Sequence, residues 1–330
     1  MYTEYFGLNR SPFSLSPDPR FLLLTPKHRE ALGGLLFAVT ARKGFMVLTG
    51  EAGTGKTTLV KKLLSSIPAR CAQFSVVVNP MLNASEFLES VLMDYGVSSV
   101  PSSKAMRLAL LRRLLLQADK EGKTSVLVVD EAHLLTSELL EEIRLLSNFE
   151  TSEHKLLQII LAGQSELNNI LDQQSMRHVK QRIAARVDLA PLAEKDVLEY
   201  VEKRWTCAGG VGPTPISESA ITLLARGSGG IPRVINALCD AVLTNAYGKG
   251  IRNIDSKDMR EVLSDMHLML PATDEAHPHP PVMCHNEAGP VDSPAPFVFR
   301  SFQRYTPKPS GAPRALRWTQ WFGLGSESRS

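Results

Sequence analysis

The chain has 330 residues, enough for one large domain or two modest ones, each with its own hydrophobic core. Hydrophobic residues make up 43% of the sequence and charged residues 22%, fractions that are ordinary for a soluble globular protein. The net charge of +3 is too small to indicate nucleic-acid binding by itself, although it does not exclude it.

The cysteines and the apolar runs indicate the cellular compartment in which the protein is expected. Cys71, Cys207, Cys239 and Cys284 lie far apart with no C-x-x-C pair, which predicts reduced, mostly buried thiols and excludes a disulfide framework or a zinc site. The N-terminus lacks the basic and apolar segments of a signal peptide. The longest uncharged, mostly apolar run, residues 31–41, is shorter than the about 20 residues of a membrane-spanning helix. The sequence therefore predicts a cytoplasmic protein without a transmembrane segment.

Residues 1–24 are rich in aromatic side chains and prolines, and their X-Pro bonds favour extended and turn conformations. From Pro26 the pattern becomes helical, with Leu32, Leu35 and Val39 at helical spacing. The sequence therefore predicts an irregular N-terminal linker followed by a helix.

A glycine-rich loop follows an apolar run at residues 45–49 and leads into a helical pattern at residues 59–64. It matches G-x-x-x-x-G-K-[ST] in a strand–loop–helix context, and its residues are Gly50, Glu51, Ala52, Gly53, Thr54, Gly55, Lys56, Thr57 and Thr58. Glycines let backbone N–H groups surround a phosphate, and the N-terminus of the next helix adds a positive dipole end. We expect Lys56 to reach the β- and γ-phosphates and the Thr57 hydroxyl to ligate Mg²⁺. The sequence therefore predicts a nucleoside triphosphate site.

The aromatic residues of the linker precede this loop closely in the sequence. Two interpretations stay open: the linker packs on the nucleotide domain and walls the adenine side, or it packs there without touching the base.

Apolar runs and helical patterns alternate after the loop. Strands are predicted at 71–78, 126–129, 156–162 and 187–189, and helices at 86–95, 105–118 and 139–146. Strands that alternate with helices indicate a parallel sheet with helices on both faces. We therefore expect an α/β nucleotide-binding domain over residues 1–191, with the linker at 1–24.

The strand pattern stops near residue 193. Helices are predicted at about 194–207, 217–226, 232–247 and 256–267, which indicates an all-helical lid domain over residues 192–268. The last 60 residues hold ten of the 21 prolines and show no helical or strand period, so residues 269–330 are predicted to be a disordered tail.

Two carboxylates follow the strand predicted at 126–129. We expect Asp130 to hold the water shell of Mg²⁺ and Glu131 to polarise the attacking water, the alternative being two surface acids at a strand end. Gln164 ends the neighbouring strand, where its amide is expected to contact the γ-phosphate or the water; the alternative is a solvated glutamine.

Residues 130–133 also spell the DEAH box of a helicase family. A helicase of that class needs two RecA-like domains, and too few strands follow residue 189 for the second. His133 is instead predicted in the first turn of the next helix.

Phosphoryl transfer also needs positive charge that arrives with the transition state, often from another subunit. Arg182 and Arg186 precede the last predicted strand and are placed for this role, and the sequence does not choose between them or exclude that either is a solvated surface residue. Arg233 follows Gly-Gly-Ile-Pro at the start of a lid helix. There it is expected to reach the γ-phosphate and to couple the lid angle to the nucleotide state, with helix-start packing as the alternative.

Together these features resemble AAA+ ATPases. More specific segments resemble the ExeA-like group, general secretion pathway protein A, whose ATPase domain is related to transposition ATPases of the TniB and TnsC type. These segments are Tyr5-Phe6-Gly7-Leu8, Pro12-Phe13, Pro17-Asp18-Pro19-Arg20-Phe21, Lys43-Gly44-Phe45, Leu145-Leu146-Ser147-Asn148-Phe149-Glu150 and Leu161-Ala162-Gly163-Gln164. The resemblance covers about residues 1–268.

The resemblance implies a P-loop NTPase fold with a five-stranded parallel sheet, flanking helices and a helical lid. It assigns Lys56 and Thr57 to Walker A, Asp130 and Glu131 to Walker B, Gln164 to sensor 1, Arg182 or Arg186 to the arginine finger, and Arg233 to sensor 2. The sequence departs from the group after residue 268, where a proline-rich tail stands in place of a transmembrane helix and a periplasmic peptidoglycan-binding domain.

Three functional hypotheses follow. The first is an oligomeric, Mg²⁺-dependent ATPase that acts as an assembly or remodelling factor on a protein of a secretion or envelope system, in the cytoplasm and peripheral to the inner membrane through that partner. The second is an ATP-dependent DNA-binding regulator of the transposition-ATPase type. The third is a scaffold that binds ATP and barely hydrolyses it.

Overall fold

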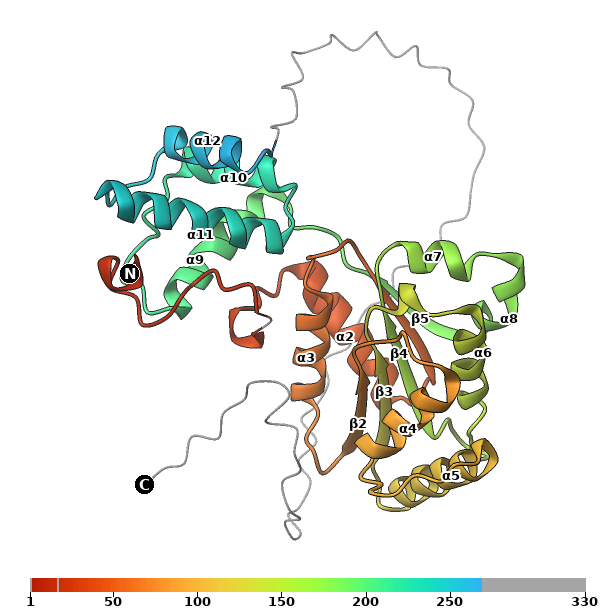
Figure 1. The fold of residues 1–330 in the computed structure, drawn as a ribbon. Coiled ribbons are helices and arrows are strands. Elements are labelled where there is room, and N and C mark those ends of the chain that lie inside the picture. Colours follow the sequence, from red (N-terminus) through yellow and green to blue (C-terminus); the bar gives the residue numbers. More distant parts are fainter. Residues whose placement is uncertain (1, 17, 269–330) are drawn as a thin grey trace, which may run out of the picture. The chain divides into compact units, whose positions relative to one another are not determined.

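The computed structural model describes residues 2–16 and 18–268 (Figure 1). In this part of the chain, five parallel strands form one sheet in the order β2-β3-β4-β1-β5. The strands are β1 (Phe45–Thr49), β2 (Ala72–Val77), β3 (Thr124–Val129), β4 (Leu157–Ala162) and β5 (Ile183–Asp188). The predicted α/β class and the five-stranded parallel sheet are confirmed.

The central strands are continuous apolar runs because helices cover both faces of the sheet. In β1, Phe45 and Val47 join the core on one face, whereas Met46 and Leu48 join the core on the other. The first face packs against α4 (Ala84–Asp94), α5 (Lys104–Lys120) and α6 (Ser137–Leu146), and the second against α2 (Pro26–Thr40) and α3 (Lys56–Ser66) (Figure 1).

The edge strand β5 differs from its prediction. It begins at Ile183 and not near residue 187, so Arg186 lies within the strand instead of before it. Its residues alternate between half-buried and exposed, because one face of this edge strand meets solvent. A strand with this mixed pattern lacks the continuous apolar run by which the other strands were predicted. Short α7 (Glu166–Leu171), η3 (Gln174–Met176) and α8 (Arg177–Lys180) connect β4 to β5.

Four helices follow β5 within the described residues: α9 (Glu194–Cys207), α10 (Glu218–Ser228), α11 (Pro232–Lys249) and α12 (Ser256–Asp265). Local signals fix their ends. Pro232 occupies the first turn of α11, Asp255 forms a capping box with Asp258 at the start of α12, and Gly229 ends α10 with a left-handed φ of 58°. The predicted helices are confirmed, whereas a domain boundary at residue 192 stays a prediction.

The N-terminal segment packs with these helices, which corrects the expectation that it packs on the nucleotide domain. Leu8, Phe13 and Phe21 belong to the same buried core as α9–α12. The buried Arg204 of α9 donates hydrogen bonds to the carbonyl oxygens of Pro12 (2.7 Å) and Ser14 (3.1 Å). Short helix η1 (Pro19–Phe21) contacts both α9 and α3, so the segment connects the helical part to the helix that follows the glycine-rich loop. The start of the chain also holds α1 (Tyr2–Tyr5).

The cysteine prediction is wrong in part. Cys239 is buried, and burial raises the pKa of its thiol. Cys71 and Cys207 are exposed, because Cys71 lies in the turn before β2 and Cys207 lies on the outer side of the end of α9. Cys284 and the predicted tail at 269–330 lie outside the described residues. No helix in the described ranges is both long and apolar enough to cross a membrane.

Candidate functional site

The glycine-rich loop lies between the end of β1 and the start of α3. Gly53 and Gly55 have left-handed φ angles of 85° and 100°, and Gly55 is the residue that precedes the helix. A Cβ atom at Gly53 would lie 2.7 Å from the Cβ of Arg233, so a larger residue does not fit there. Left-handed glycines directly before a helix N-terminus are typical of loops whose backbone N–H groups bind an anion.

Lys56 is folded back over the loop. Its side chain is buried, with 6% of the residue exposed, and Nζ donates to the carbonyl oxygens of Gly50 and Glu51 at 2.8 Å each. Burial lowers the pKa of this lysine, while the nearby carboxylates of Glu131 and Asp130 oppose the shift. The ammonium therefore lies inside the loop, where a phosphate would meet it.

Thr57 and Asp130 converge from two different elements. The Thr57 hydroxyl donates to Asp130 Oδ2 at 2.8 Å, and Asp130 is buried at the end of β3. Strand β4 lies between β1 and β3, so the sheet order brings the loop after β1 and the acids after β3 to the same edge. A hydroxyl and a carboxylate oxygen in contact are hard oxygen donors of the kind that Mg²⁺ prefers, so the residues present fit this ion.

Glu131 turns away from Asp130. Its backbone has a left-handed φ of 51°, which is uncommon for a residue with a side chain and directs adjacent carboxylates to different places. The Glu131 side chain is 44% exposed, whereas Asp130 Oδ1 accepts a hydrogen bond from the Glu131 backbone N–H at 3.0 Å. Asp130 is therefore held inside the site, whereas the Glu131 side chain is partly exposed, with its Oε2 3.5 Å from His133 Nδ1.

Gln164 lies directly beyond Gly163 at the end of β4, between the other two strand ends. Its backbone N–H donates to His133 Nδ1 at 3.3 Å, and its side-chain amide lies 3.1 Å from His133 Nε2. His133 belongs to the short helix η2 (Ala132–Leu134), separate from α6, so its predicted place in the next helix is wrong. Sequence reasoning missed its contact with Gln164; the DEAH letters were the only signal present.

Arg233 is brought to the loop by the start of α11. Its backbone N–H donates to the Gly53 carbonyl at 3.2 Å, and the residue is exposed. The first turn of α11 therefore touches the loop through its backbone, whereas contact of the Arg233 side chain with a γ-phosphate stays a prediction.

Arg182 and Arg186 are not brought to this site. Ile183, which follows Arg182, pairs with Phe45 at the beginning of β1, and Arg186 pairs with Val47 in its middle. Because a strand advances about 3.3 Å per residue, the backbone at Arg182, one residue before Ile183, is on the order of 17 Å from the loop end of β1. Both arginines are exposed, and Arg186 Nη1 lies 3.9 Å from Asp172 Oδ1.

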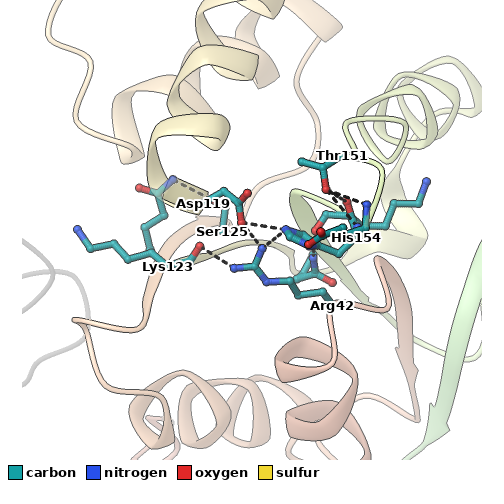
Figure 2. Close-up of polar contacts among 10 residues, drawn as sticks. Arg42, Asp119, Lys123, Ser125, Thr151 and His154 are labelled. Atoms are coloured by element: carbon teal, nitrogen blue, oxygen red, sulfur yellow. Dashed lines mark hydrogen bonds and ion pairs between the residues drawn. The ribbon is translucent and has the colours of Figure 1, made fainter. Parts of the chain in front are cut away.

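A second polar cluster lies at the opposite end of the sheet, where β1, β3 and β4 begin (Figure 2). Arg42 contacts the carboxylate of Asp119 and donates to the Lys123 carbonyl at 3.4 Å, and His154 Nε2 lies 2.9 Å from Asp119 Oδ1. The hydrogen bond from Arg42, with a smaller one from His154, holds the pKa of Asp119 below its ordinary value. This cluster connects the segments that precede β1, β3 and β4, and it lies at the end of the sheet opposite the glycine-rich loop.

Comparisons with known proteins agree with this architecture. A family model described as "AAA domain" matches residues 39–171. General secretion pathway protein A of Aeromonas hydrophila is 42% identical over 263 residues, which cover 78% of this chain and 47% of that protein. The chain thus spans about half the length of this relative, and the predicted resemblance is confirmed.

Solved structures show the same fold. The Aeropyrum pernix ORC2 protein superposes with a TM-score of 0.59 at 16% identity, covering 78% of this chain and 71% of that one. The Thermotoga maritima RuvB Holliday junction branch migration motor gives 0.51 at 19% identity, covering 75% and 72%. At such low sequence identities the similarity shows the fold alone, which is that of AAA+ proteins. This fold and the match to the AAA domain together support ATPase activity.

Proposed function

We propose that this chain, which has the AAA+ fold and carries an AAA domain, is a Mg²⁺-dependent ATPase that works as a homo-oligomer. The hydrogen bond between Thr57 and Asp130, beside the loop that encloses Lys56, is the observation that carries the proposal. It supports one site in which the loop residues bind the phosphates and the strand ends supply the acids.

In this proposal Lys56 exchanges the carbonyls of Gly50 and Glu51 for phosphate oxygens, and the loop N–H groups bind the remaining ones. Thr57 and Asp130 would hold Mg²⁺, which when bound neutralises the charge of the β- and γ-phosphates. The partly exposed Glu131 orients the attacking water by accepting its hydrogen bond. Gln164 contacts the γ-phosphate or the water, and Arg233 links the lid to the loop.

We propose Arg182 as the arginine that completes a neighbour's site. Its backbone lies at the far end of β5 from the subunit's own loop, and the residue is exposed, with an electrostatic interaction with Glu150. Arg186 lies in the middle of the strand and faces Asp172 at 3.9 Å. A site that needs another subunit's arginine loses activity on dilution.

The test is the specific ATPase rate measured over a hundredfold range of protein concentration, with a Glu131→Gln preparation as the contamination control. We expect the rate per subunit to fall as the oligomer dissociates. A flat rate contradicts the trans arginine, and a rate equal to that of Glu131→Gln contradicts ATPase activity and favours an ATP-binding scaffold.

The biological role that we propose is assembly or remodelling of a protein partner in a secretion or envelope system. The similarity to general secretion pathway protein A supports it. The protein would act in the cytoplasm, at the inner membrane through that partner. A deletion strain complemented with the parent or with Glu131→Gln tests this: we expect a secretion or envelope defect that only the parent repairs.

ATP-dependent DNA binding is the second candidate. The exposed Arg112, Arg113 and Lys120 on α5 favour it, because clustered basic side chains contact phosphates. Filter binding with and without ATP, at several salt concentrations, separates the two roles. A salt-sensitive complex that needs ATP and disappears in an Arg112→Ala/Arg113→Ala variant would favour the DNA regulator.

A further inference from the structure

His133 and Gln164 contact each other at two points. The His133 side chain is 12% exposed and lies between the ends of β3 and β4. Its Nδ1 accepts the backbone N–H of Gln164 at 3.3 Å, and its Nε2 is 3.1 Å from Nε2, the nitrogen of the Gln164 side-chain amide. The backbones also approach closely here, since a Cβ at Gly163 would lie 3.0 Å from the His133 nitrogen. The ring is therefore held in place by main-chain atoms.

The backbone contact decides which ring nitrogen carries the proton. A backbone N–H is only a donor, so Nδ1 accepts through its lone pair, and the neutral ring then carries its hydrogen on Nε2. The amide nitrogen of Gln164 faces Nε2, and two N–H donors cannot bond each other. Turning the amide by 180° places its oxygen there as the acceptor, and the two ends of an amide are assigned from such a network. The N–H₂ group of Gln164 is then the end left free.

We propose that His133 is a positioning residue that orients the Gln164 amide, so that Gln164 offers hydrogen-bond donors to a terminal phosphate. This inference rests on the proposed function, in which Gln164 contacts the γ-phosphate or the water. With the opposite orientation the amide oxygen would face the phosphate oxygens and repel them. Glu131 Oε2 also lies 3.5 Å from Nδ1, but the Gln164 backbone N–H is the nearer partner of that nitrogen at 3.3 Å.

The kinetic test uses paired variants. We expect His133→Ala to lower kcat by roughly tenfold, as loss of one transition-state contact does, while the Kd for Mg·ATP stays within about twofold. His133→Gln should recover most of the rate, because its amide nitrogen can occupy the place of Nε2. The double variant with Gln164→Ala should be no slower than Gln164→Ala alone. The matched control is His178→Ala, an exposed histidine on α8, which should keep the parent rate.

A spectroscopic readout does not depend on activity. In ¹⁵N-histidine-labelled protein without nucleotide, the His133 ring should show an unprotonated Nδ1 and a protonated Nε2. Gln164→Leu should shift these resonances, and Gln117→Leu on the exposed side of α5 should not.

The results separate this inference from the proposed function. A proton on Nδ1, or losses that multiply in the double variant, overturns the positioning role even when the parent is an active ATPase. A parent that hydrolyses no ATP overturns both the proposed function and the role of His133 in turnover.

Discussion

The Thr57 hydroxyl donates a hydrogen bond of 2.8 Å to the Asp130 carboxylate, although the two residues are 73 positions apart in the sequence. One follows the glycine-rich loop in α3 and the other ends β3, and the sheet order alone brings them together. The proposed metal and phosphate site depends on this contact.

Replacing Lys56 should weaken nucleotide binding. The ammonium donates charge-assisted hydrogen bonds, each contributing about 1.5–3 kcal/mol, so Lys56→Ala should lower the affinity for Mg·ATP by roughly 10- to 100-fold. Calorimetric titration measures this, with Lys120→Ala on the exposed side of α5 as the control. Unchanged affinity in Lys56→Ala would remove the basis of the proposed site.

Mixing two inactive variants should restore hydrolysis. Arg182→Ala keeps Glu131 but cannot complete a neighbour's site, whereas Glu131→Gln keeps Arg182 but cannot orient water. In mixed oligomers an Arg182→Ala subunit beside a Glu131→Gln subunit regains a complete site, so the rate should rise well above that of either variant alone. The same mixture made with Arg186→Ala tests the other arginine; recovery there and not with Arg182→Ala would reverse the assignment.

Removing Arg204 should destabilise the protein. The residue is 7% exposed, and its guanidinium donates to the Pro12 and Ser14 carbonyls and lies 4.8 Å from the centre of the Phe21 ring. Arg204→Ala leaves the buried Pro12 carbonyl unpaired and removes the packing of the guanidinium, at a cost of about 2–4 kcal/mol. Urea unfolding measures the loss, and Arg226→Ala on the exposed side of α10 should change stability by less than about 0.5 kcal/mol.

The cluster around Asp119 should make stability depend on acid pH. The pKa of this carboxyl is lowered in the folded protein, chiefly by its hydrogen bond from Arg42, so the unfolded chain binds its proton first as the pH falls. The stabilisation is therefore complete above the ordinary value near 3.8 and is lost as the pH falls through the lowered folded pKa.

Asp119→Asn tests this linkage. We expect the variant to be less stable than the parent by roughly 1–3 kcal/mol at pH 7, and the difference to shrink below about pH 4. Unfolding curves across this range give the comparison. A difference that is the same at pH 3 and pH 7 would mean that the Asp119 charge contributes nothing.

Local patterns determined most of the fold from the sequence. The glycine-rich loop, the buried strands β3 and β4 and the helices α9–α12 follow from short-range periodicity, turn residues and caps, which act between residues only a few positions apart. Strand β5 was found only in part, because an edge strand with an exposed face carries arginines where a buried strand carries apolar residues.

The sequence alone therefore determined the loop chemistry of Lys56 and Thr57 and the acids of the strand end. The tertiary structure decided which distant residues meet: His133 with Gln164, Arg204 with the carbonyls of the N-terminal segment, and Arg182 at the far end of the sheet from its own loop. Those contacts depend on strand order and on the burial of surfaces contributed by separate elements, and no local pattern along the chain encodes them.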